Sequence, residues 1–155
     1  AIVVKKPWAA MLVSGEKVWE LRGKRTGHRG RVAIAESGTG ALIGECVLID
    51  CKPVGHRGPG EALVPPQLHP ENFLGLPQNV DRHRVNNFNE VPYHQVWAYV
   101  MSKPIKYVYP IPYAHPRGAV TWVKLASTGL QTDTSKTTRK APTVKTALPK
   151  TSKQK

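Results

Sequence analysis

Short apolar runs separated by polar and glycine-bearing connections recur along most of this chain, a pattern typical of β-strands. The runs are rich in Val, Ile, Leu, Trp and Tyr, and they cover residues 2–5, 17–22, 31–36, 41–51, 96–101, 105–109 and 119–125. Residues 7–14 differ and predict a short helix, because a proline begins them, a glycine follows them, and Trp8, Met11 and Leu12 recur at helical spacing. Several short strands with one early helix predict a compact, barrel-like α+β domain.

Two segments do not follow this pattern. Residues 53–92 are rich in Pro, Gly, His and Asn and far exceed a usual connection, so we expect a functional excursion or a short helix whose position the pattern does not give. Residues 127–155 contain seven basic residues, one acid and no aromatic residue. Such a segment cannot bury enough apolar surface to offset its ordering entropy. We therefore predict a domain over residues 1–126 and a disordered basic tail over 127–155.

Charge narrows the classes of partner. The chain has 23 Lys and Arg against 10 Asp and Glu, a formal charge of +13; seven bases and one acid give the tail +6, which leaves +7 for the domain. An excess of this size indicates a polyanion such as nucleic acid, an anionic membrane surface or an acidic protein. No run approaches the ~20 apolar residues that a membrane-spanning helix needs, so no membrane partner is expected.

The two cysteines do not indicate a disulfide. Cys46 and Cys51 lie five positions apart in one strand-like run, and an odd separation points them to opposite faces. We expect two reduced, half-buried thiols, typical of a cytosolic protein, and with no secretory signal visible we expect a cytoplasmic location. The six histidines are scattered without metal-ligand companions, so neither a metal site nor a cofactor is expected.

Residues 5–22 read KKPWAAMLVSGEKVWELR, which contains a Pro-Trp-Ala helix start followed by G-x-K-x-x-E-x-R. The second motif consists of Gly15, Lys17, Glu20 and Arg22. Residues 29–31 before a strand, Gly44, and Pro-Ile-Pro-Tyr at 110–113 followed by Gly118 continue the order. Together these pieces resemble the ASCH domain, a branch of the PUA-like superfamily, over about residues 2–125. The chain departs from the family at Lys6, where Gln is common, and over 53–92, where no family pattern aligns.

The resemblance implies a small PUA-like β-barrel with a cleft. Family members are linked to RNA or DNA binding and to RNA-associated regulation, and fold alone does not choose among activities. Some small bacterial members are amidohydrolases that act on acetylated cytidine, and some have been assigned nuclease activity. Those amidohydrolases use a lysine, a hydroxyl nucleophile three positions later and a distal acid. Here Lys17 is present, but Glu20 stands at the nucleophile position and cannot replace a threonine in acyl chemistry.

Lys17, Glu20 and Arg22 are the main candidate site residues. On an ideal strand Glu20 and Arg22 share a face, roughly 7 Å apart, and Lys17 joins them only if it lies in the turn that Gly15 permits. In the functional interpretation Lys17 and Arg22 contact a phosphate or a base edge, and Glu20 accepts from a base amino group or orients Arg22. The alternative is an exposed strand with ordinary surface charges.

The remaining candidates surround this motif. Trp8 packs in the core or stacks on a base, while Trp97, Tyr99 and Trp122 are expected in the core. The glycine-bearing connection over residues 23–30 and the residue after it form a basic cluster that either contacts phosphates or is a solvated loop. The members of this cluster are Lys24, Arg25, His28, Arg29 and Arg31. By the resemblance, the cleft rim takes Lys6, Ser37, His115 and Arg117.

These observations favour a nucleic-acid-binding module, with RNA or a single strand preferred over duplex DNA because a cleft with a basic rim suits an unstacked base. The predicted nucleic-acid-binding residues are Lys6, Trp8, Lys17, Glu20, Arg22, Lys24, Arg25, Arg29, Ser37, His115 and Arg117. Two alternatives stay open. One is a hydrolase of amidohydrolase or ribonuclease type acting on a modified nucleoside or an RNA strand, with Lys17 and Glu20 as its catalytic residues. The other is a protein-interaction module of a larger regulator.

Overall fold

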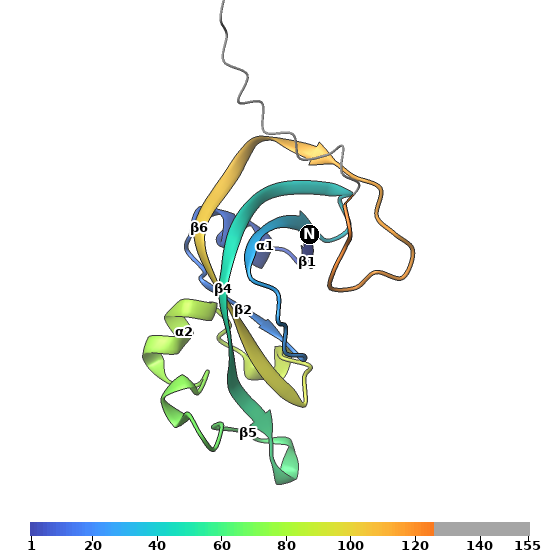
Figure 1. Ribbon diagram of the computed structural model, residues 1–155. Helices are drawn as coiled ribbons and strands as arrows, with labels where there is room; N and C mark the ends of the chain where they lie inside the picture. The colour runs from blue at the N-terminus through green and yellow to red at the C-terminus, as the bar shows by residue number, and fades with distance from the viewer. Residues whose placement is uncertain (126–155) are drawn as a thin grey trace, which may run out of the picture.

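The computed structural model describes residues 1–125 and shows a mixed α+β architecture around a six-stranded sheet (Figure 1). The strands are β1 (Ile2–Val4), β2 (Trp19–Arg22), β3 (Gly30–Glu36), β4 (Ala41–Arg57), β5 (Leu63–Val64) and β6 (Gln95–Pro112). The helices are α1 (Trp8–Ser14) and α2 (Pro77–His83), and short 3-10 turns occupy Pro59–Glu61, Pro70–Asn72 and Phe88–Glu90. The sheet order is β1-β3-β4-β6-β2, with β5 paired to β4.

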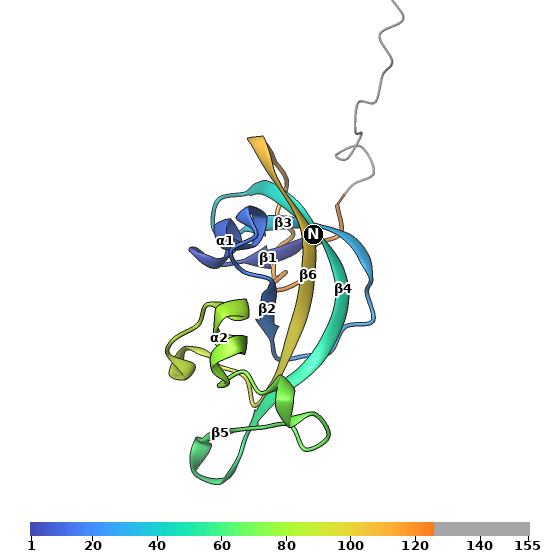
Figure 2. The same ribbon diagram turned by 90° about the vertical axis from the view of Figure 1, so that its left-hand side faces the viewer.

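The long antiparallel pair of β4 and β6 is the frame of the molecule. Both strands run along its length and curve over at one end, and α1 and α2 lie on the same side of the pair (Figure 2). The β4–β6 register shifts at several places, and such bulges bend a strand. No pairing among residues 1–125 joins β1 to β2, so the sheet is open. The α+β prediction is confirmed, whereas closure into a PUA-like barrel is not.

The predicted early helix is confirmed as α1, and its C-terminal cap at Gly15 leads into the turn before β2. Gly15 adopts φ 86°, and its N–H bonds to the carbonyl of Leu12, a left-handed cap that glycine forms at little cost. On the other side of the helix, a Cβ at Gly44 would lie 2.6 Å from Val13 Cγ1. The helix therefore rests directly on the backbone of β4. Of the predicted apolar face Leu12 is buried, while Trp8 and Met11 are half-buried.

The segment over residues 53–92 is not a single long loop. Strand β4 continues through Arg57, and the rest of the segment forms β5, the three 3-10 turns and α2. Its apolar side chains Leu74, Val85 and Val91 pack with Trp19 and other residues of β2 in one core cluster. The helix whose position the pattern did not give is α2, and the whole segment is a layer against one end of the sheet.

Two strand predictions need correction. The expected strands over 96–101 and 105–109 are one continuous strand, β6. The expected strand over 119–125 is wrong, since this part of the chain forms only an isolated bridge between Ile2 and Trp122. It runs beside β1, and Val3 N donates to Thr121 O over 2.9 Å. Because β1 has only three residues, the segment beside it has too few partners for a longer strand pairing.

The cysteine prediction also fails in part. Cys46 and Cys51 are both free, but both are fully buried and belong to the same core cluster rather than to opposite faces. The reason is a register shift between Leu48 and Asp50 in the β4–β6 pairing, which interrupts the alternation of side chains between them. Two residues five positions apart on a bulged strand therefore need not point to opposite faces, as they would on a regular strand.

Within residues 1–125, no helix is long and apolar enough to cross a membrane. The same residues contain no group of three or more His, Cys, Asp or Glu side chains that could hold a metal ion. The predicted tail over 127–155 and its boundary at residue 126 lie outside the described residues.

Candidate functional site

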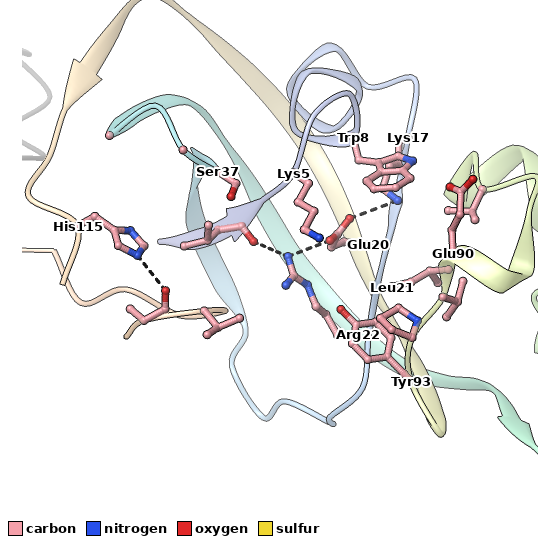
Figure 3. Close-up of a pocket in the computed structure, with 18 of the residues that line it drawn as sticks. Lys5, Trp8, Lys17, Glu20, Leu21, Arg22, Ser37, Glu90, Tyr93 and His115 are labelled. Atoms are coloured by element: carbon pink, nitrogen blue, oxygen red, sulfur yellow. Dashed lines mark hydrogen bonds and ion pairs between the residues drawn. The ribbon is translucent and has the colours of Figure 1, made fainter. Parts of the chain in front are cut away.

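A cavity of about 780 Å³ opens beside β2 (Figure 3), a volume within the range of small-molecule sites. One side is formed by α1 and by residues 85–93, and the other by the ends of β1 and β3 and by residues 113–120. Six predicted site residues line it: Trp8, Lys17, Glu20, Arg22, Ser37 and His115. The structure therefore brings together residues that are up to about a hundred positions apart in the sequence.

At the centre of the cavity lies a buried charge triad of Lys17, Glu20 and Arg22 (Figure 3). Lys17 Nζ is 3.2 Å from Glu20 Oε2, and Arg22 Nη2 is 2.9 Å from Glu20 Oε1. The three side chains are 2%, 9% and 10% exposed. Lys17 lies in the turn after Gly15, which allows it to reach the face that Glu20 and Arg22 share on β2. The interpretation of these residues as ordinary surface charges is wrong.

Backbone carbonyls also accept hydrogen bonds from the two cations. Lys17 Nζ donates to His83 O over 2.9 Å, and Arg22 Nη2 donates to Val3 O over 2.6 Å. Burial lowers the pKa of Lys17, and the neighbouring Glu20 carboxylate opposes that shift. Each Glu20 oxygen already bonds to one cation of the triad, which leaves the carboxylate fewer acceptor sites for a ligand.

Arg22 keeps a donor without a partner. Its Nε is buried and has no hydrogen-bond partner among the described residues, although Nη2 is fully used. A buried, unsatisfied N–H costs on the order of 1–3 kcal/mol, and Arg22 is one of the residues that line the cavity. Arg22 is therefore the member of the triad whose guanidinium keeps a buried donor that the described residues do not use.

Aromatic side chains lie on two sides of the triad. Lys17 Nζ is 5.8 Å from the centroid of the Trp8 ring, within cation–π range. Tyr93 lies near Arg22 in Figure 3, and its ring packs on Gly23, where a Cβ would lie 2.7 Å from Tyr93 Cδ1. A residue larger than glycine at this point would displace the ring, so Gly23 permits the approach of Tyr93 to β2.

Residues 85–93 form a wall that the sequence did not reveal. This wall is anchored to β2 through α2, because Val18 N donates to Arg82 O over 2.9 Å and the Arg82 guanidinium lies 5.1 Å from the Trp19 ring. The cavity residues that sequence reasoning missed include Lys5, Glu90, Tyr93 and Tyr113. The available signal was the unusual length of the 53–92 segment.

His83 holds this wall to the triad and was also missed. The side chain is 0% exposed. Its Nδ1 accepts from Val85 N over 3.1 Å, so Nε2 carries the proton and donates to Leu74 O over 2.8 Å. The pKa of the His83 ring is lowered mainly because burial desolvates its charged form. The nearby Lys17 charge lowers this pKa to a smaller extent. The folded protein therefore favours the neutral form of His83.

We expect stability to fall as the pH decreases below about 6.5, the pKa of an unperturbed histidine. In that range the unfolded chain binds a proton that folded His83 does not bind, and the free energy of unfolding drops by up to about 1.4 kcal/mol per pH unit until the lowered folded pKa is reached. Denaturant unfolding at pH 7, 6 and 5 measures the slope. His83→Gln should reduce it, and the exposed-site control His94→Gln should not. Equal slopes in all three proteins would contradict this role.

Five predicted site residues do not line the cavity: Lys6, Lys24, Arg25, Arg29 and Arg117. Lys6 pairs with Glu36 at the surface, 3.3 Å away. Arg29 donates to the carbonyls of Thr26 and His28 and lies 3.4 Å from Asp50, so it holds its own loop together. Lys24 and Arg25 are exposed on the same loop.

The other basic and rim residues have partners of their own. Arg31 forms a two-pronged ion pair with Glu45, with Nη2 within 2.6 and 2.7 Å of its oxygens. The ring of His115 bonds to the Tyr113 hydroxyl over 2.8 Å and to Ala119 O over 2.9 Å. His115 thus braces the 113–120 side of the cavity. Of the expected core aromatics, Tyr99 is buried and Trp97 is partly buried, whereas Trp122 reaches the surface.

Comparisons with known proteins agree with the sequence motifs. The family model of the ASCH domain matches residues 2–73, while none of the curated proteins matches this chain. Similar solved structures include the crystal structure of ASCH from Zymomonas mobilis, at 21% identity over 72% of this chain and 71% of that one, with a TM-score of 0.40. Two variants of that protein, each 20% identical, give TM-scores of 0.43 (72% and 74% covered) and 0.46 (79% and 87% covered).

Proposed function

Because this chain carries an ASCH domain, we propose that it binds nucleic acid and holds one unpaired base or nucleotide of an RNA or single strand in the cavity beside β2. ASCH domains are broadly thought to bind RNA. The observation that carries the proposal is the buried charge triad, which opens into an aromatic-lined cavity and leaves Arg22 Nε without a partner. Duplex bases are stacked and paired, so they cannot enter such a cavity without first being extruded.

The charges of the triad favour contact with a base edge over contact with a bare phosphate. Two cations and one carboxylate give it a net charge of +1, and Glu20 already bonds to both cations. In this proposal Arg22 donates to a carbonyl or ring nitrogen of the base, Glu20 orients Arg22, and Trp8 and Tyr93 contact the base plane. Lys5 also lines the cavity, and in this proposal it contacts the attached phosphate.

A salt-titrated binding assay tests the proposal. The affinity of the full chain is measured for single-stranded RNA, single-stranded DNA and duplex DNA of equal length. At high salt, the two single strands are expected to bind more tightly than the duplex. Phosphate contacts weaken with salt, with a slope of about −0.7 per contact for single strands, whereas a base held in a cavity leaves affinity that salt does not remove. If all three ligands bind equally and lose all affinity at high salt, the protein binds polyanions through its basic surface and the cavity proposal is wrong.

A hydrolase acting on a modified nucleoside is the second candidate. It is favoured by Lys17, which is buried in a cavity with a lowered pKa beside a carboxylate, because perturbed ionisable groups cluster at catalytic sites. Against it, Glu20 stands where the amidohydrolases of the family have their hydroxyl nucleophile, and both its oxygens are in ion pairs.

We therefore expect no measurable release of acetate from acetylated cytidine. Chromatography of the nucleoside after long incubation with concentrated protein measures it, with Lys17→Ala as the matched control. Turnover well above background that is lost in Lys17→Ala would make the hydrolase the better assignment.

A further inference from the structure

We infer that the surface around Trp122 is a second nucleic-acid contact, which takes the nucleotide next to the one held in the cavity. The inference rests on the proposed function and extends it from a single nucleotide to a strand. This surface, the Trp122 platform, consists of the rings of Trp122 and His28 and the cations Lys24 and Arg25 on the loop over residues 23–30.

An aromatic column leads from the core to this surface. The Trp122 ring stacks on Tyr99, with centroids 6.1 Å apart and planes at 25°. The His28 ring lies 5.4 Å from Trp122, tilted by 56°. Tyr99 is buried, Trp122 is 37% exposed and His28 is exposed. Trp122 is therefore held from below by a fixed ring and stays accessible at the surface, which is the arrangement of a stacking platform.

The loop that carries the cations is held by hydrogen bonds to β4 and β6 and by others within the loop. Tyr99 Oη donates to Lys24 O over 2.8 Å, and Thr26 N donates to Cys51 Sγ over 3.5 Å. Arg29 donates to the carbonyls of Thr26 and His28. A loop fixed in this way loses little conformational freedom on binding.

Lys24 and Arg25 are the cations that this loop does not use for its own structure. Both are exposed, and neither forms an ion pair with any residue in the range 1–125. The nearby carboxylate, Asp50, pairs with Arg29 and Lys52 instead. The platform therefore combines an accessible tryptophan with two unneutralised positive charges, which is the combination that single-stranded nucleic acid requires for its bases and its phosphates.

Short stretches of chain connect the platform to residues that line the cavity. Arg22, which lines the cavity, is followed directly by Gly23 and the basic loop. The carbonyl of Val3 accepts from Arg22, and its neighbour Ile2 bridges Trp122. Val120, which lies two residues before Trp122, lines the cavity as well. In this inference a strand leaves the cavity past Val120, which is exposed, and meets Trp122 next.

The test compares the affinity of the full chain for a fluorescent single-stranded RNA octanucleotide with that of two leucine variants. Trp122→Leu keeps an apolar side chain but removes the stacking ring, and it should weaken binding by about tenfold, since stacking on one aromatic contributes on that order. Tyr109→Leu is the matched control, because Tyr109 is 82% exposed on β6 and does not belong to the platform. It should leave the affinity unchanged.

A charge pair supplies a second readout that does not depend on packing around Trp122. Lys24→Ala should weaken binding several-fold and reduce the salt slope by about 0.7, the value for one phosphate contact. Lys106→Ala removes the same charge from an exposed position on β6 and should have less effect on both. If Trp122→Leu lowers the melting temperature, this pair decides the question.

The outcomes separate the two proposals. One outcome is that wild type binds the octanucleotide and Arg22→Lys weakens binding, while Trp122→Leu has no effect and Lys24→Ala weakens binding no more than Lys106→Ala does. The platform proposal is then wrong, and the cavity proposal stands. If wild type does not bind the octanucleotide, both proposals are overturned.

Discussion

Replacing Glu20 by glutamine is expected to lower the free energy of unfolding by about 3–5 kcal/mol, the cost of removing one partner from a buried ion pair. Glutamine has the shape of glutamate but not its charge. The side chains of Lys17 and Arg22 are only 2% and 10% exposed. The substitution would therefore leave two buried cations with no neutralising carboxylate between them. The carbonyls of His83 and Val3 accept from them but carry no net charge.

Denaturant unfolding of Glu20→Gln and a surface control measures this effect. Glu36→Gln is the control, because Glu36 pairs with Lys6, whose side chain is 67% exposed. Exposed pairs contribute about 0–1 kcal/mol, so the two variants should differ by several-fold. The double variant Lys17→Met with Glu20→Gln should recover part of the lost free energy of unfolding, since it removes one of the two unneutralised cations. A loss of less than 1 kcal/mol in Glu20→Gln would show that the triad does not depend on its carboxylate.

The triad itself could be predicted because its signals are local. Glu20 and Arg22 alternate on one strand, and Gly15 permits the turn that carries Lys17. The wall opposite could not, because α2 reaches the triad through the backbone carbonyl of His83 and contacts the neighbouring Val18 through that of Arg82. Every residue has a carbonyl, so a contact made by one leaves no side-chain pattern in the sequence.

Non-local pairing also explains why some cations of the predicted basic cluster have acidic partners and others do not. Arg29 and Arg31 were grouped with Lys24 and Arg25 as phosphate contacts, but Asp50 and Glu45 lie beside them on β4. Which acid faces which base depends on the register of β3 against β4, and that register includes an irregularity between Ile34 and Ala35. Composition shows that a loop is basic, whereas the register decides which of its charges stay free.

Replacing Arg22 by lysine is expected to weaken the binding of single-stranded RNA by about 10- to 100-fold, in line with about 1.5–3 kcal/mol for a hydrogen bond to a charged group. Lysine keeps the positive charge and can still pair with Glu20. It lacks the planar guanidinium, and with it the Nε donor that has no partner among the described residues. If Arg22 reads a base edge, the affinity falls while the slope of log affinity against log salt stays the same, because no charge is removed.

Lys24→Arg is the matched control for this substitution. It also exchanges the two basic residue types, but at an exposed position on the adjoining loop, and it should change the affinity by less than about twofold because a phosphate accepts either cation. Both variants are measured by titration with one RNA octanucleotide at two salt concentrations, after circular dichroism has shown that they fold. Wild-type affinity in Arg22→Lys would mean that Arg22 acts only through its charge. The buried triad would then be a structural element of β2, and recognition would belong to the exposed basic loop.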